Sequence, residues 1–219
     1  FRMMQYVILA AGEFPKRGET LDILTGGDIL ICCDGAVEDA LRYRVPDFIV
    51  GDMDSISPQN KERFREIIHS ESEQEYNDLT KAVRFTLRHA QGVTGPFSIT
   101  ILGATGKRED HTLGNISLLI MYAEMLPEGA TIEMVSDRGR FVPIDGDGSI
   151  LVGRGREISI FATDPTLKLT TFGVEYPTDE VIFDQWSWWK ATLNVATEDT
   201  VTFKMNHPAR ILVYVGGMR

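Results

Sequence analysis

The chain has 219 residues, of which 43% are hydrophobic and 25% charged, and 32 acidic against 22 basic residues give a formal charge of -10. This composition excludes a disordered chain, and no apolar run reaches the roughly 18 residues of a membrane span. The acid excess would repel a phosphodiester backbone, so we expect neither nucleic acid nor a membrane as a partner.

The two cysteines, Cys32 and Cys33, are adjacent. Neighbours in an extended strand point to opposite faces, so these thiols are not expected to form a disulfide between two elements. The first residues also lack the long apolar stretch of a signal peptide. Together these features predict a protein of a reducing compartment, and we expect a cytoplasmic one.

Short, nearly continuous apolar runs in the first part of the chain predict strands covered on both faces, as in a parallel sheet. These runs cover residues 6–10, 29–33, 48–50, 98–102 and 131–135. Helical patterns separate several of them. The alternation predicts an α/β domain with a largely parallel, Rossmann-like sheet.

Three helices are expected between these strands. The first begins after an N-cap at Ser57, with proline at its first position, and ends near Ile68. The second is capped by Asn77 or Asp78, and the third covers about 110–125 with an apolar stripe that includes Leu113.

From about residue 141 the pattern changes to short β-type segments separated by turn residues, with no convincing helix. The expected strands are residues 149–152, 157–162, 167–171, 180–183, 200–204 and 210–215. Short strands at this spacing predict a small all-β sandwich or barrel. We therefore expect two domains, an α/β domain over 1–138 and a β-sandwich over 139–219.

Acidic residues follow the predicted strands at the edge where an open α/β sheet binds ligands. They are Asp34, Asp52, Asp54, Asp78 and Asp110. Carboxylate oxygens that converge from several loops suit Mg²⁺, which shares its remaining positions with substrate phosphates. The alternative is that residues 52–58 form only a turn with helix caps, and the residues alone leave both interpretations open.

A glycine loop over residues 103–108 follows a strand and precedes a helix, the context in which backbone N–H groups bind phosphate. Its spacing is not that of a P-loop. Lys107 and Arg108 suit phosphate oxygens, and Arg108 could bind them in bidentate fashion. The alternative is a turn with two solvated basic side chains.

The order and spacing of these segments strongly resemble the thiamine pyrophosphokinase family, over essentially the whole chain. The resemblance is carried by residues 34–36, 46–55, 77–82, 103–111 and Asn115. It implies that the thiamine hydroxyl attacks the β-phosphorus of ATP, with Mg²⁺, to give thiamine diphosphate and AMP. It also implies a homodimer with its active site between subunits.

The resemblance assigns roles to individual residues. Asp52, Asp54 and Asp78 would hold the metal, and with Arg108 and Asp110 they form the expected catalytic set. The expected ATP-binding residues are Asp34, Gly35, Asp54, Thr80, Lys81, Thr105, Gly106, Lys107, Arg108 and His111.

Two of these residues have competing interpretations. Lys81 could contact phosphate or remain a solvated lysine, and the residues favour neither. His111 is favoured as a residue that orients the loop rather than one that transfers protons.

The expected thiamine-binding residues are Asp78, Asp110, Tyr176, Thr197 and Glu198. The resemblance sets Tyr176 where an aromatic ring stacks on the pyrimidine. Two departures from the family pattern are a lysine instead of a second glycine at Lys107 and the pair Thr197-Glu198 instead of Ser-Asn.

For the tryptophans Trp186, Trp188 and Trp189, core and interface packing is favoured over a substrate wall. Two other functions compete with the main one. These are the same pyrophosphoryl transfer to another primary alcohol, such as a hydroxymethylpterin, and non-catalytic nucleotide binding.

Overall fold

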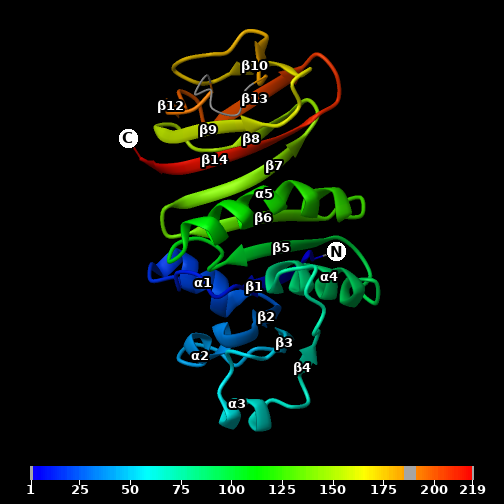
Figure 1. The fold of residues 1–219 in the computed structure, drawn as a ribbon. Coiled ribbons are helices and arrows are strands. Elements are labelled where there is room, and N and C mark those ends of the chain that lie inside the picture. Colours follow the sequence, from blue (N-terminus) through cyan, green and yellow to red (C-terminus); the bar gives the residue numbers. More distant parts are fainter. Residues whose placement is uncertain (1, 185–190, 219) are drawn as a thin grey trace. The chain divides into compact units, whose positions relative to one another are not determined.

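The computed structural model describes residues 2–184 and 191–218 and divides into two compact units, Phe1–Asp137 and Arg138–Arg219 (Figure 1). Trp186, Trp188 and Trp189 lie outside the described residues, so their predicted packing is not tested. Within the described ranges, no helix is long and apolar enough to cross a membrane.

The N-terminal unit contains six strands in the order β6-β5-β1-β2-β3-β4, and every neighbouring pair is parallel. They are β1 (Met4–Leu9), β2 (Ile29–Cys33), β3 (Phe48–Gly51), β4 (Ile68–Ser70), β5 (Phe97–Leu102) and β6 (Thr131–Ser136). The predicted parallel sheet is therefore present. Its order turns back at β1, which lies between β2 and β5, and ligand crevices form at such switch points in open α/β sheets.

The helices of this unit are α1 (Gly18–Gly26), α2 (Val37–Ala40), α3 (Pro58–Arg63), α4 (Asp78–Ala90) and α5 (Glu109–Met125), with a 3-10 turn η1 (Asp34–Ala36). Two predicted caps are present. Ser57 Oγ accepts the Asn60 N–H at 3.2 Å, and Asn77 Oδ1 accepts the Thr80 N–H at 2.9 Å. The Asn77 cap fixes where α4 begins and makes Asp78 its first residue.

Several predicted elements differ in extent. Helix α3 ends at Arg63 rather than near Ile68, because residues 68–70 leave the helix and pair with β3 as β4. Leu113, expected on the buried stripe of the third helix, is 58% exposed. Helices α1 and α2 and strand β4 were not predicted.

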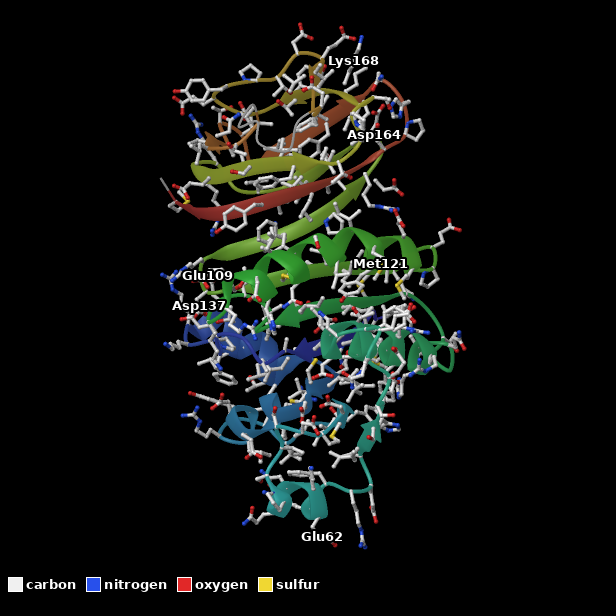
Figure 2. The ribbon with its side chains drawn as sticks, viewed as in Figure 1. Glu62, Glu109, Met121, Asp137, Asp164 and Lys168 are labelled. Atoms are coloured by element: carbon white, nitrogen blue, oxygen red, sulfur yellow. The ribbon has the colours of Figure 1, made fainter. Side chains whose placement is uncertain are left out.

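The first turn of helix α1 is capped by a residue far along the chain. Its N-cap residue, Arg17, makes no side-chain cap, but the Asp137 carboxylate accepts the N–H groups of Lys16 and Arg17 at 2.8 and 3.2 Å. The Thr20 hydroxyl also donates to Asp137, which is labelled in Figure 2. Partial burial opposes ionisation, yet these hydrogen bonds hold the pKa of Asp137 below its usual value. A carboxylate from the end of β6 thus stabilises the first turn of α1.

The C-terminal unit contains two antiparallel sheets, with strand orders β12-β9-β14-β7 and β11-β10-β13-β8. The strands are β7 (Gly139–Asp145), β8 (Gly148–Leu151), β9 (Arg156–Ala162), β10 (Lys168–Phe172), β11 (Val181–Ile182), β12 (Asn194–Val195), β13 (Thr200–Met205) and β14 (Arg210–Met218). Ile160 and Val213 of one sheet share a buried core with Leu169 and Phe203 of the other. The described part of this unit is thus β-rich, as predicted, although β7 and β12 were missed.

We predict that Asp137→Ala lowers the stability of the N-terminal unit by about 1–2 kcal/mol, the cost of losing a helix cap. Because the pKa of Asp137 is lowered by folding, its contribution is present above the unfolded-state pKa and is lost as the pH falls through the folded value. Urea unfolding followed by far-ultraviolet circular dichroism measures the loss, since every described helix lies in this unit.

The matched control is Glu62→Ala, which removes an exposed acid whose one ion-pair partner among the described residues is the exposed Arg65. It should change stability by less than about 0.5 kcal/mol. Equal losses in the two variants, or a loss from Asp137→Ala that persists at low pH, would contradict the capping role.

Candidate functional site

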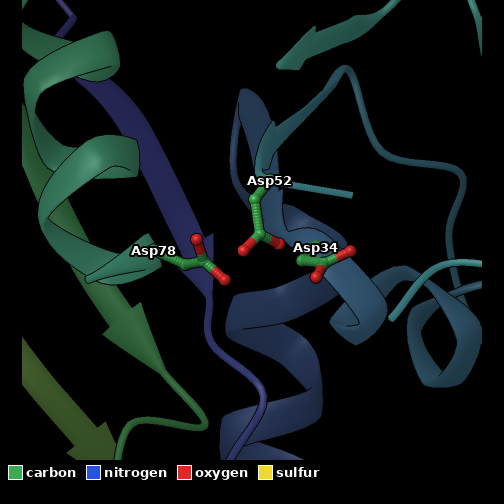
Figure 3. A group of neighbouring side chains, drawn as sticks. All are labelled: Asp34, Asp52 and Asp78. Carbon is green, nitrogen blue, oxygen red and sulfur yellow. The ribbon is translucent and has the colours of Figure 1, made fainter. Parts of the chain in front are cut away.

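Three carboxylates meet at the edge of the parallel sheet (Figure 3). Asp34 opens η1 directly after β2, Asp52 follows β3, and Asp78 is the first residue of α4. One carboxylate oxygen from each lies within 4.8 Å of those from the other two. Hard oxygen donors at this spacing fit Mg²⁺.

Unusual backbone conformations allow this approach. Asp34 has φ +41°, in the left-handed region, and its carboxylate accepts the Ser55 N–H at 3.0 and 3.3 Å. Gly51 has φ +150°, and a Cβ atom there would lie 3.2 Å from Asp78 Oδ1 and 3.1 Å from Asp34 Cβ. A side chain at position 51 would therefore press against two of the three acids.

The pKa values of two of these carboxylates, Asp34 and Asp78, are raised. Burial raises the pKa of Asp34, and the nearby charge of Asp52 raises it further, while the Ser55 N–H lowers it. Burial and Asp52 likewise raise the pKa of Asp78, against the lowering effect of Lys81. The group therefore holds negative charge at a cost in free energy that a bound cation would reduce.

Lys81 is 3% exposed, so the interpretation of it as a solvated lysine is wrong. Its ammonium group lies 3.7 Å from Asp78 Oδ1 and donates to the Glu71 carbonyl at 2.9 Å. A buried lysine is retained at such a position when it is paired, and Asp78 supplies the opposite charge.

Asp54 lies apart from this group. Its side chain is exposed, and its backbone N–H donates to Asp52 Oδ1 at 3.2 Å. Asp34 lies with Asp52 and Asp78, and its expected position along the nucleotide stays a prediction. The metal role of Asp54 stays a prediction.

A pocket of about 370 Å³ lies beside the carboxylates, where the strand order turns back between β1 and β5. Asp78 lines it together with Gly106, Lys107, Arg108 and His111, which were predicted for nucleotide binding. The further lining residues are Ala10, Ala11, Gly12, Cys33, Asn77, Leu79, Ala104 and Asn115.

Residues 10–12 line the pocket but were not predicted as part of the site. The available signal was a run of small residues after the first strand. Gly12 is required there, because a Cβ atom would lie 2.4 Å from the Gly103 carbonyl oxygen. The loops after β1 and β5 can approach this closely only without a side chain at position 12.

The loop after β5 has its carbonyl groups fixed by the protein. Those of Gly103 and Thr105 accept the N–H groups of Gly12 and Glu13 at 2.6 and 2.8 Å, and that of Ala104 accepts a hydrogen bond from Asn115 at 2.8 Å. Within residues 2–184 and 191–218, the amide groups of residues 104–107 donate to no protein acceptor. Such a loop is suited to binding an anion.

The basic residues of this loop are exposed. The Arg108 guanidinium donates to both Asp110 oxygens, at 3.1 and 2.7 Å, and this contact raises the pKa of Arg108 and lowers that of Asp110. The His111 N–H also donates to Asp110, at 2.9 Å. Lys107 adopts φ +61°, a left-handed conformation that explains why glycine would suit this position.

Two predicted ATP-binding residues face the protein. The Thr80 hydroxyl lies in the core, 2.6 Å from the Tyr122 hydroxyl of α5. Gly35 packs against Ser55, since a Cβ atom at position 35 would lie 2.9 Å from the Ser55 carbonyl oxygen.

In the C-terminal unit, the three expected thiamine-binding residues lie on two paired segments. Val174 forms an antiparallel bridge with Ala196, and the Thr197 N–H donates to the Gly173 carbonyl at 2.9 Å. Asn194 fixes the backbone of Tyr176 by accepting its N–H at 3.0 Å and donating to its carbonyl at 2.7 Å. The Tyr176 ring is 63% exposed, and Glu198 is exposed as well.

Comparison with known proteins identifies both units. The model of the thiamin pyrophosphokinase catalytic domain matches residues 21–128, and that of the thiamin pyrophosphokinase substrate-binding domain matches residues 139–214. A rice relative named thiamine pyrophosphokinase 1 is 30% identical over 179 residues, which are 74% of this chain and 62% of the relative. The match thus spans less than two thirds of the relative's length.

Solved structures share the fold. Thiamin pyrophosphokinase from Candida albicans superposes with a TM-score of 0.82 at 19% identity, over 96% of this chain and 89% of that one. Thiamine pyrophosphokinase from Bacillus subtilis gives a TM-score of 0.74 at 21% identity, over 97% and 98%.

We predict that Asp52→Asn stabilises the protein without metal at neutral pH by about 1 kcal/mol, or about 2–4 °C in Tm. Folding raises the pKa of Asp34 and Asp78, so the native state retains protons that the unfolded chain loses. Wild-type stability therefore falls as the pH rises from about 3.8 through the raised values, and removing the Asp52 charge relieves this fall.

Thermal unfolding in a chelator, measured across that pH range, tests this prediction. Asp54→Asn is the matched control, because Asp54 lies on the same loop outside the three-carboxylate group, and its gain should be smaller. A stabilisation by Asp52→Asn that is independent of pH would rule out relief of repulsion as its cause.

Proposed function

We propose that this chain, which belongs to the thiamin pyrophosphokinase family, is an enzyme that transfers pyrophosphate from ATP to the hydroxyl of thiamine. The products are thiamine diphosphate and AMP. One observation carries the proposal: a single pocket is lined both by Asp78, a member of the three-carboxylate group, and by Lys107 and Arg108 of an anion-binding loop. An acidic protein could bind a polyphosphate only with such an arrangement.

In this proposal the loop after β5 binds the phosphates. The amide groups of residues 104–107 and the side chains of Lys107 and Arg108 would meet phosphate oxygens. Arg108 would then exchange its contact with Asp110 for a phosphate, which frees Asp110 to bind substrate. His111 lines the pocket beside them and would orient the loop. Lys81, which is buried, would act through its ion-pair partner Asp78 rather than in solvent.

We propose that Asp34, Asp52 and Asp78 hold Mg²⁺. The three oxygens fit the ion, because they are hard donors whose mutual repulsion a cation would reduce. The metal would supply neutralisation of the charge on the transferred phosphates. The carboxylates would orient the triphosphate for in-line attack by the thiamine hydroxyl. Its oxygen would bond to the β-phosphorus as the bond from that phosphorus to the leaving AMP breaks, and one of the aspartates would accept the hydroxyl proton.

The C-terminal unit would bind thiamine. The exposed Tyr176 ring offers a stacking surface, and Thr197 and Glu198 lie on the segment paired with it. A carboxylate at Glu198 suits a cationic thiazolium. We further propose that the protein is a cytoplasmic homodimer with its active site between subunits and a Rossmann-like nucleotide-binding domain. Its two free, buried cysteines are compatible with a reducing compartment.

The deciding experiment incubates purified protein with ATP, Mg²⁺ and thiamine. We expect AMP and thiamine diphosphate in equal amounts, and no product after chelation of the metal. Formation of ADP and thiamine monophosphate would contradict pyrophosphoryl transfer. Product from a hydroxymethylpterin instead of thiamine, or nucleotide binding without turnover, would support one of the two competing functions.

Asp78→Asn should lower kcat at least about 100-fold, because it removes both a metal ligand and the partner of Lys81. Asp54→Asn distinguishes two possible sets of metal ligands. A loss of kcat of similar size would place Asp54 among the ligands, whereas activity within about threefold of wild type would restrict the ligands to the three-carboxylate group. Full activity of Asp78→Asn would remove the proposed metal site.

Tyr176→Ala should raise the KM for thiamine about tenfold and leave the KM for ATP unchanged, since stacking on the ring is lost. Phe172→Ala is the matched control, because Phe172 is another exposed aromatic residue of the same unit. If the two variants have equal thiamine KM values, Tyr176 does not contact thiamine.

A further inference from the structure

A relay of hydrogen bonds joins the start of α4 to the loop after β5. Asn77 Nδ2 donates to Asn115 Oδ1 at 3.1 Å, and Asn115 Nδ2 donates to the Ala104 carbonyl at 2.8 Å. Asn77 Oδ1 accepts the Thr80 N–H at 2.9 Å, so the relay ends in the backbone of α4. Asn77, Asn115 and Ala104 all line the pocket.

Both members of the relay require an amide side chain. Each uses its oxygen as an acceptor and its nitrogen as a donor, and the planar amide of asparagine or glutamine carries both. Serine at position 77 could still cap α4, but it is too short to replace the donor that reaches Asn115. The cap and the relay are therefore separable by substitution.

Among the residues that the structure describes, Asn115 alone donates a side-chain hydrogen bond to the carbonyls of residues 103–105. The carbonyls on either side of Ala104 are fixed by the backbone of residues 12 and 13. Fixing three successive carbonyls determines the directions of the peptide planes between them, and so where the following N–H groups point. Without Asn115 the central carbonyl would lose its partner.

We infer that Asn115 is a positioning residue for the nucleotide. Its hydrogen bond to the Ala104 carbonyl fixes the anion-binding loop. Its hydrogen bond to Asn77 holds that loop at a fixed spacing from Asp78, the next residue of the chain. The inference rests on the proposed function in one respect, that phosphates bind this loop. A triphosphate would have to meet the loop and the carboxylates at once, so a fixed spacing between them lowers the cost of binding.

The test uses Asn115→Ala, Asn77→Ser and the double variant. Ser117→Ala is the matched control, because within the described ranges the Ser117 hydroxyl bonds only to the Gly114 carbonyl of its own helix. Binding of MgATP is measured by calorimetry without thiamine, and kinetics are measured with each substrate varied in turn. Thermal unfolding reports any general loss of stability.

We expect each single variant to weaken MgATP binding, and to raise the KM for ATP, about five- to tenfold, the effect of one hydrogen bond. The KM for thiamine should stay within about twofold of wild type, and Ser117→Ala should match wild type. Because the two substitutions cut the same relay, the double variant should bind MgATP about as weakly as Asn115→Ala alone.

Unchanged MgATP affinity in Asn115→Ala overturns the inference, as does full additivity in the double variant. Equal changes in the KM for ATP and for thiamine would reveal general loosening instead of positioning. If Asn115→Ala does not fold, Asn77→Ser carries the test, because Asn77 is exposed and serine keeps its cap.

Failure of the proposed function can be distinguished from failure of the inference on Asn115. A wild-type protein that binds MgATP but does not convert thiamine would contradict the proposed reaction, while the calorimetric comparison of the variants would still decide the role of Asn115. A wild-type protein that does not bind MgATP at all would overturn both.

Discussion

Repulsion among three partly buried carboxylates is the constraint on which the site depends. Asp34, Asp52 and Asp78 come from three different segments, and their oxygens lie within 4.8 Å of one another. Neither hydrophobic burial nor strand pairing favours such a group, so the surrounding chain must impose it. It does so with a left-handed residue at Asp34, a position at Gly51 with no room for a side chain, and the buried ammonium of Lys81. Sites of function commonly retain strain and charge of this kind because the ligand relieves them.

The parallel sheet could be predicted because its strands are short apolar runs, and β2 was located to the residue. Elements that depend on distant partners could not. Helix α1 has no cap of its own and begins where Asp137, more than a hundred residues away, meets its first turn. Strand β4 has only one half-buried residue, Ile68, and is a strand because it pairs with β3. Neither signal exists within a local window of sequence.

The candidate site, like the fold, could be predicted only in part. The edge of the sheet, the carboxylates and the glycine loop followed from their positions after predicted strands. The choice among the acids did not, because it depends on backbone conformation: the left-handed turn at Asp34 lies beside Asp52, while Asp54 remains exposed. The burial of Lys81 also could not be predicted, since its partner Glu71 contributes a backbone carbonyl, which any residue type could supply.

One residue of the pocket beside the carboxylates has a chemical consequence for inhibitor design. Cys33 lines the pocket, yet it is almost fully buried, and burial raises the pKa of its thiol well above the usual value. Thiolate, not thiol, attacks electrophiles, so a compound that carries an acrylamide or chloroacetamide group into this pocket would not be trapped there. The same property protects the site from oxidation by peroxide. An electrophile aimed at Cys33 would therefore add little to the affinity that a compound gains from the shape and charge of the pocket.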